Sequence, residues 1–314
     1  MNVVSYGLVH PLKQLLCVLY CLVVSLPVTA ADDCYGPGVR LQVLGSGGPE
    51  LDDRRASSGY LVWQDGRVRV LVDMGPGSLL NFERSGARVE DIELILLSHL
   101  HVDHSADLPA LVKGSFFTRR NTDLSIYGPT GNRVMPATGD FLRALFADGE
   151  GAFRYLGSYL NGEDDYRLKP VDVPAERESS RAIFEKSGLR FSAVPVHHGQ
   201  IPALAWRVDI GGHSLAFSGD MNGDWDRLPA LAKDADLLVA HNAVPENAAG
   251  VARYLHMPPS VIGRIAKVAG VKRLILSHRM QRTLGRESES EAIIRRQYSG
   301  PLDFADDGQC FSLD

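Results

Sequence analysis

The sequence has few cysteines, no excess of positive charge and no apolar run long enough to span a membrane. Four cysteines occur among 314 residues, and none downstream of residue 30 belongs to a closely spaced pair, which argues against a thiolate zinc cluster. The formal charge is −5, from 33 Lys plus Arg against 38 Asp plus Glu, so composition gives no support to nucleic-acid binding. No tandem repeat, low-complexity tract or linker divides the chain.

The first thirty residues have the pattern of a secretory signal peptide. Lys13 precedes an uncharged apolar run from Leu15 to Leu26, and Pro27 and small residues lead to a cleavage site before Ala31. A membrane anchor is the alternative, but the run is well below the ~20 residues that a spanning helix needs. We therefore expect export to the periplasm or the medium, with no membrane anchor in the mature form.

Export would leave two cysteines, Cys34 and Cys310, near the two ends of the mature chain. In an oxidising compartment two such thiols can form one disulfide, and two unpaired thiols are the alternative. Removal of Lys13 would also make the mature chain more negative by one charge.

From residue 41 onward, short β-rich runs alternate with glycine turns. The run 93–97 is almost wholly apolar, which is typical of a strand buried on both faces. A helix is predicted over 260–269, because Ser260 can cap its first turn and Gly270 can end it. The other predicted strands are 41–44, 59–62, 68–72, 189–196, 204–208, 214–217, 237–239 and 274–276.

Residues 113–188 differ from the rest because they combine charged and aromatic side chains without a steady strand pattern. Residues 140–160 could be helical. We interpret the segment as an insertion that packs its aromatic side chains against the main body. A lid or a wall of the substrate site is the alternative, since long insertions in compact domains often carry function.

The segment with the clearest chemistry follows the buried run 93–97 directly. His99, His101, Asp103 and His104 form an HxHxDH pattern at the expected end of that strand. Three imidazoles and a carboxylate would be costly in a protein interior unless something pairs them. Imidazole nitrogen and carboxylate oxygen are the usual non-thiolate ligands of zinc, so the pattern predicts a metal centre.

Further donors stand at the ends of other predicted strands. His197 and His198 end one strand, Asp220 ends another, and His278 ends a third. A single histidine in such a place is often a hydrogen-bonded structural residue, but the set as a whole favours metal binding. A carboxylate such as Asp220 can bridge two cations, with one oxygen on each.

These motifs together resemble the metallo-β-lactamase superfamily of dinuclear metallohydrolases. Residues 44–48, 55–60 and 72–75 (LGSGG, RASSGY and VDMG) are similar to its ribonuclease Z, arylsulfatase and cyclic phosphodiesterase branch. The resemblance spans residues 41–279, with 113–188 outside it. It implies an α/β fold of the α+β kind. In this four-layer αββα sandwich, two mixed β-sheets lie face to face and helices cover their outer faces. The domain would cover residues 31–314.

The resemblance also implies roles for individual residues. Asp73 would orient a ligand imidazole by accepting its other N–H, and His256 would face the scissile group. The choice of His198 over His197 depends on the register of the residues that follow, Gly199 and 202–207. The implied metal ligands are His99, His101 and His198 for one ion, Asp103, His104 and His278 for the other, and Asp220 as the bridge between them.

The charge of two neighbouring cations indicates the mechanism. Two divalent ions can share a water molecule and make it hydroxide near neutral pH, and Asp103 would hold that hydroxide in line. His256 would stabilise the developing charge or protonate the leaving group. Zinc is the expected metal, and manganese or iron also suits these ligands.

The substrate is the least determined feature. The resemblance favours a small phosphodiester or a sulfate or other ester. Export, the negative charge and Asn242, which stands where ribonuclease Z enzymes have a glutamate, argue against tRNA processing, and nucleic acid is not expected as a partner. The alternatives are a β-lactamase- or lactonase-like amide or ester hydrolase, against which Asp220 argues, and a catalytically silent metal-binding protein. The oligomeric state stays open.

Overall fold

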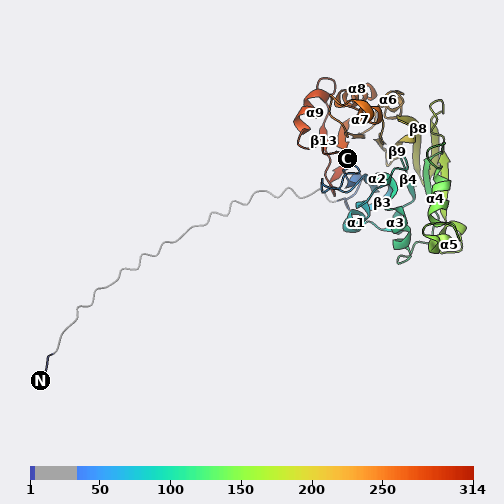
Figure 1. Cartoon of the computed structure of the whole chain (residues 1–314), viewed down its shortest axis with the longest axis horizontal. Helices are drawn as coiled ribbons and strands as arrows, with labels where there is room; N and C mark the ends of the chain where they lie inside the picture. The colour runs from blue at the N-terminus through green and yellow to red at the C-terminus, as the bar shows by residue number, and fades with distance from the viewer. Residues whose placement is uncertain (4–33) are drawn as a thin grey trace. The chain divides into compact units, whose positions relative to one another are not determined.

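Two seven-stranded mixed β-sheets form the body of the protein (Figure 1). The computed structural model describes residues 1–3 and 34–314, so the signal-peptide prediction for residues 1–30 lies almost entirely outside the described residues. The strand order is β14-β1-β2-β3-β4-β5-β6 in the first sheet and β13-β12-β11-β10-β9-β8-β7 in the second. Each sheet has an antiparallel part and a parallel part. The parallel part consists of β3 to β6 in the first sheet and of β10 to β13 in the second.

The strands match the predicted runs and extend most of them by one to three residues. Strands β5, β6, β7, β13 and β14 were not predicted. The first sheet consists of β1 (Val39–Gly45), β2 (Gly59–Gln64), β3 (Arg67–Met74), β4 (Leu94–Leu96), β5 (Leu124–Pro129), β6 (Leu168–Val173) and β14 (Cys310–Ser312). The second sheet consists of β7 (Ala182–Lys186), β8 (Leu189–His198), β9 (Ile201–Ile210), β10 (His213–Phe217), β11 (Leu237–His241), β12 (Arg273–Ser277) and β13 (Leu302–Phe304).

Short helices connect the strands. The helix predicted over 260–269 begins one residue earlier, because Pro259 takes the first helical position and Pro258 precedes it as the cap. Ser260 therefore does not cap the helix, and its amide donates to Glu246 instead. The helices are α1 (Ser78–Arg84), α2 (Val102–Ser105), α3 (Leu108–Ser115), α4 (Thr138–Phe146), α5 (Gly157–Asn161), α6 (Leu228–Leu231), α7 (Gly250–Leu255), α8 (Pro259–Ala269) and α9 (Glu287–Ile294), with 3-10 turns η1 (Val89–Asp91) and η2 (Arg154–Leu156).

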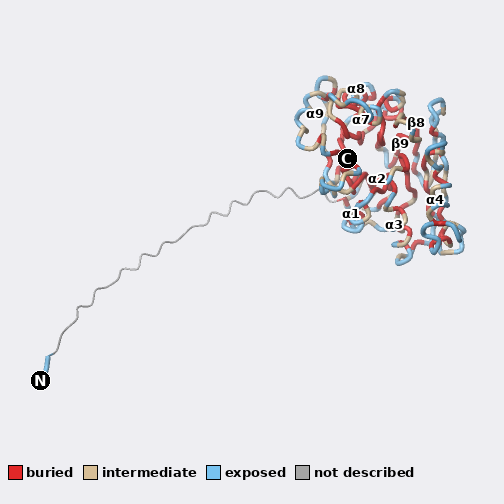
Figure 2. The backbone as a smooth tube through the Cα atoms, in the orientation of Figure 1, coloured by how far each residue is buried: buried red, intermediate tan, exposed pale blue. Residues whose placement is uncertain are grey.

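Three apolar cores hold four layers together. Alternation along β4 shows the arrangement, because Leu94 and Leu96 point into the core between the sheets while Ile95 points to the opposite face. The outer core of the first sheet includes residues of α1, α3, α4 and α5. The outer core of the second sheet includes residues of α6, α8 and α9. Figure 2 shows that much of the buried backbone lies in the interior of the body. The predicted αββα sandwich is confirmed.

Residues 113–188, interpreted from sequence as an insertion, contribute strands to both sheets. β5 and β6 pair in parallel beyond β4, and β7 pairs with β8. Residues 140–160 are helical in two pieces, α4 and α5, with a break between them. The strands of this segment therefore belong to the main sheets, and a lid role for the remainder stays a prediction.

The first sheet is closed at one edge by the end of the chain. β14 pairs with β1, with Cys310 opposite Gln42. Cys34 and Cys310 form a disulfide, with their Cα atoms 5.8 Å apart. Within the described residues no helix combines the length and apolar character of a membrane span.

Candidate metal centre

The carboxyl ends of strands from both sheets meet at one rim of the sandwich. β4 leads into His99, and in the second sheet β8, β10, β11 and β12 end at or just before His198, Asp220, His241 and His278. Helix α2, which follows β4, lies close to the end of β3: a Cβ at Gly75 would lie only 2.0 Å from the carbonyl oxygen of Asp103 in this helix. Glycine is therefore required at position 75.

The first group of donors consists of His99, His101 and His198. The Nε2 atom of His99 lies 3.0 Å from Nδ1 of His101, and Nε2 of His198 lies 3.4 Å from the same atom. The other ring nitrogen of His198 donates to the carbonyl of Leu255 at 3.0 Å. The other ring nitrogen of His99, Nδ1, lies 3.1 Å from Oγ of Ser98.

The protonation states of these rings fit a cation between them. Burial lowers the pKa of His99 well below its usual value and also lowers that of His101 and of His198. Because His198 uses Nδ1 as a donor, its neutral ring presents a lone pair at Nε2. Nε2 of His99 and Nε2 of His198 both face Nδ1 of His101, at 3.0 and 3.4 Å, so three ring nitrogens converge on one small volume. The group thus suits a divalent metal ion.

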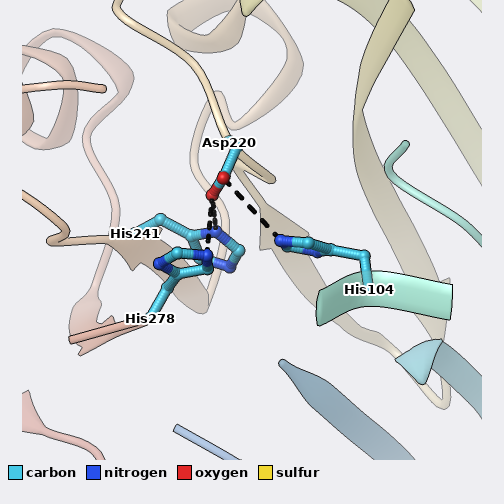
Figure 3. Close-up of side chains that lie close together, drawn as sticks. All are labelled: His104, Asp220, His241 and His278. Atoms are coloured by element: carbon cyan, nitrogen blue, oxygen red, sulfur yellow. Dashed lines mark hydrogen bonds and ion pairs between the residues drawn. The ribbon is translucent and has the colours of Figure 1, made fainter. Parts of the chain in front are cut away.

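The second group surrounds the carboxylate of Asp220 (Figure 3). His104 lies on one side of this carboxylate, and His241 and His278 lie on the other. The Oδ1 atom of Asp220 is 3.4 Å from Nε2 of His278, and Nε2 of His278 is also 3.1 Å from Oδ2 of Asp103. Burial raises the pKa of Asp220, but the neighbouring imidazoles outweigh burial and hold it well below the usual value.

One buried nitrogen of this group fits a metal ligand most directly. His104 is fully buried, and its Nδ1 contacts Oδ2 of Asp73 at 2.8 Å. Its Nε2 has no hydrogen-bond partner among the described residues, although it points toward Asp103 at 3.5 Å and Asp220 at 3.7 Å. A buried polar atom without a partner costs free energy, and a cation between this nitrogen and the two carboxylates would remove that cost.

Asp220 connects the two groups. Its Oδ2 lies 3.7 Å from Nε2 of His104 and 3.7 Å from Nε2 of His198. The ring centroids of His99 and His104 are 4.0 Å apart. One carboxylate oxygen therefore faces a histidine of each donor group, whereas the sequence led us to expect one oxygen for each ion; a bridging ligand can use either arrangement.

Asp73 holds the ring of His104 from behind. Besides His104, its carboxylate accepts hydrogen bonds from the amide and the hydroxyl of Ser98, both at 2.7 Å. These contacts are those that an orienting role requires. Asp73 and His278 also have left-handed backbone conformations, with φ of 56° and 51°, which cost a non-glycine residue free energy.

His241 is the residue of this centre that the sequence did not identify as a metal-site residue. Its Nδ1 lies 2.7 Å from Oδ1 of Asp220, and its Nε2 lies 3.1 Å from the hydroxyl of Tyr60. Burial lowers its pKa to about 4, so the ring is neutral and donates from Nδ1 to the carboxylate. The sequence signal that could have identified it is its position just after the predicted strand 237–239, because the other donors also follow predicted strands.

His256 lies beside Asp220 and His198. Its Nδ1 is 3.7 Å from Oδ2 of Asp220, and its ring is 5.4 Å from that of His198. With these two residues it forms a third set of potential metal donors. Burial lowers the pKa of His256 to about 3, so the imidazole is neutral at physiological pH.

The structure thus brings every proposed metal ligand to one place and separates the two adjacent histidines of β8. His198 faces the first group, whereas the ring of His197 stacks on Trp225, with ring centroids 5.3 Å apart. Each predicted ligand lies within 3.7 Å of at least one other predicted ligand. The set consists of His99, His101, Asp103, His104, His198, Asp220 and His278.

Two facing mixed sheets with histidine and aspartate donors at a shared rim define a class of metal-binding αββα proteins. The chain belongs to the β-lactamase superfamily, because a family model described as a beta-lactamase superfamily domain matches residues 68–279.

Known relatives agree with this membership. Ribonuclease Z of Mycobacterium avium is 27% identical over 283 residues, which cover 86% of this chain and 96% of the relative. The metallo-β-lactamase fold protein YhfI from Bacillus subtilis has a similar structure, with a TM-score of 0.67 and 22% identity over 87% of this chain and 98% of that one. The short form of human tRNase Z has a TM-score of 0.66 and 21% identity, with 88% and 99% covered. The relatives support a metal-dependent hydrolase of the phosphodiesterase type.

Proposed function

We propose that this protein is an exported hydrolase that uses two divalent metal ions, zinc foremost, to cleave a small phosphodiester or sulfate ester. The observation that carries the proposal is the position of Asp220, whose Oδ2 lies 3.7 Å from a ring nitrogen of each donor group. His99, His101 and His198 would hold one ion, and Asp103, His104 and His278 the other. Bound divalent ions would activate water and stabilise the charge that develops on the ester.

The chain's own residues would position the reactants. Burial raises the pKa of Asp103, but His104 and His278 outweigh burial and hold it below its usual value, so the carboxylate is ionised at neutral pH. An ionised carboxylate can accept a hydrogen bond from an attacking water molecule and orient it. His256 is neutral, because burial lowers its pKa to about 3. A neutral imidazole can donate one N–H to an ester oxygen or to the leaving group.

Two observations support export and a small substrate. The Cys34–Cys310 disulfide is typical of exported proteins. The formal charge of −5 disfavours a large polyanion. The name ribonuclease Z describes the relatives as acting on RNA, so RNA belongs among the substrates to be tested.

Mass spectrometry of the exported protein is expected to find Ala31 at its amino terminus.

The test is a metal analysis combined with a substrate panel on one purified sample. We expect two metal equivalents per chain and turnover of bis-p-nitrophenyl phosphate or p-nitrophenyl sulfate. Turnover of nitrocefin alone would indicate a lactamase instead, and cleavage of RNA alone would move the substrate to nucleic acid. Bound metal without turnover of any of these compounds would leave a metal-binding protein and contradict the proposed reaction.

The first mutational prediction concerns Asp103. Asp103→Asn keeps the side-chain volume but removes the negative charge, so kcat is expected to fall by about 10² to 10⁴. Asp107→Asn is the matched control, because Asp107 lies four positions further on and accepts from the amide of Leu79 instead of facing the centre. Near-normal turnover of Asp103→Asn, with folding checked by circular dichroism, would show that Asp103 does not act on the water.

A further inference from the structure

A cavity of about 360 Å³ opens on the same rim as the metal centre. Its walls come from both sheets: residues 130–134 follow β5, residues 175–176 follow β6, and residues 199–202 include the turn between β8 and β9. Gly199, which lines the cavity, directly follows His198. One wall of the cavity is therefore the turn that directly follows a proposed metal ligand.

Trp225 supplies an aromatic wall. One face of its indole is covered by His197, whose ring lies 5.3 Å away at an interplanar angle of 22°. His197 is itself held by the amide of Asn222, 2.7 Å from its Nδ1, and by the edge of Tyr254. Because His197 covers one face of the indole, a bound ring could stack only on the opposite face.

The other walls are fixed by hydrogen bonds and carry polar groups. Asn132 donates to the carbonyl of Gln200 at 2.9 Å, which ties the loop after β5 to the β8–β9 turn. Its side-chain oxygen accepts from the amide of Val134 at 2.7 Å. Arg133 lines the cavity, is exposed and makes no hydrogen bond or ion pair with other described residues. A cavity with one aromatic side chain, amide groups, the cation of Arg133 and the carboxylate of Glu176 is suited to a flat, polar ring system.

We propose that this cavity is a substrate subsite that binds a flat aromatic group of the ester, of the size of a nucleobase, by stacking it on Trp225. The inference rests on the proposed function, because it places the ring next to an ester held at the metal centre. Because every base has a π-face, loss of the aromatic side chain beneath it is expected to weaken binding about tenfold or more. Arg133 would lie beside the ring or an anionic group attached to it.

The first experiment measures binding without catalysis. Adenosine has a base but no phosphate, so its binding to the purified protein does not depend on the attraction of metal ions for phosphate. By calorimetry we expect wild type to bind adenosine and Trp225→Ala to bind it about tenfold more weakly or worse. Phe117→Ala is the matched control, because Phe117 is an exposed aromatic side chain outside the cavity wall. Benzyl alcohol as a second probe distinguishes a simple aryl group from a nucleobase.

The second experiment measures turnover. Trp225→Ala is expected to reduce kcat/KM about tenfold for the methyl ester of adenosine 5′-phosphate, with little effect on dimethyl phosphate, which has no aromatic ring; methanol release measures the turnover of both. Equal losses on both substrates, or no binding of either ring by wild type, would overturn the subsite. If wild type hydrolyses neither ester, the proposed function fails, and the adenosine titration still decides whether the cavity binds a ring.

Discussion

Adjacent histidines at the end of β8 have opposite surroundings. His198 is buried beside His101, and His197 is stacked on Trp225. The alternation of side chains along a strand explains the difference, because successive residues point to opposite faces. A pair that is ambiguous in the sequence is thus resolved by the register of one strand.

This contrast gives a prediction at the scale of single residues. His198→Ala removes a proposed ligand and is expected to lower zinc affinity by more than the ~10–100-fold typical of an outer-sphere contact. His197→Ala, the matched control, is expected to keep the zinc content of wild type, measured by atomic emission on dialysed protein. If His197→Ala loses zinc and His198→Ala keeps it, the assignment of the ligand is reversed.

At the scale of secondary-structure elements, one carboxylate joins the ends of three strands in the second sheet. Asp236, just before β11, accepts from the amide of Ser214 at 2.7 Å and from the ammonium group of Lys272 at 2.6 Å. Burial raises the pKa of Asp236, but these two donors outweigh burial and hold it below the usual 3.8. The depressed pKa means that Asp236 stabilises the folded protein above pH 3.8 and that this contribution is lost as the pH falls through the folded-state value.

Asp236→Asn is therefore expected to destabilise the protein at pH 7 and to have little effect at acid pH. Asparagine still accepts from Ser214, so the loss is about 0.5–1 kcal/mol, with the exposed Lys272 partner screened by water. Urea unfolding at several pH values measures the difference between variant and wild type. Glu178→Gln removes one negative charge from an exposed position and controls for net charge. A difference that stays constant between pH 3 and pH 7 would contradict this account.

The strands that the sequence predicted are those with continuous apolar or alternating runs. β5 and β6 were missed because Pro129 ends the former, and Lys169, Pro170 and Asp172 interrupt the latter. β13 and β14 have three residues each, too few to show a period. These strands exist because neighbouring strands pair with them, and pairing between distant segments leaves no local pattern.

The candidate centre was more predictable than the sheets, because HxHxDH concentrates four donors within six positions. His241 lacked such a signal. It ends an apolar run, Leu237–His241, in which one histidine looks like an ordinary strand residue. Its proximity to Asp220 becomes visible only when β11 is placed beside β10.

At the scale of the whole molecule, one covalent bond joins the two ends of the described body. Cys34 precedes β1, and Cys310 begins β14, which pairs with β1. The loop that this disulfide closes has a sequence separation of 276 residues. A long closed loop restricts the unfolded chain more than a short one, although measured effects also depend on strain in the folded state.

Cys34→Ala combined with Cys310→Ala is expected to destabilise the protein by about 2–5 kcal/mol. Chemical unfolding of the oxidised wild type and the double variant measures the loss. Reductant should lower the stability of wild type to a similar extent and should leave the double variant unchanged. An equal response of both proteins to reductant would place the effect elsewhere.

The left-handed backbone at Asp73 and His278 affects which substitutions evolution would favour at these two positions. Two residues of the centre therefore also have strained backbone conformations. Glycine or asparagine would suit either backbone better, so selection for robustness alone would erode the centre at these two positions. A descendant freed from its chemistry should therefore lose these side chains early and become harder to unfold as it does so.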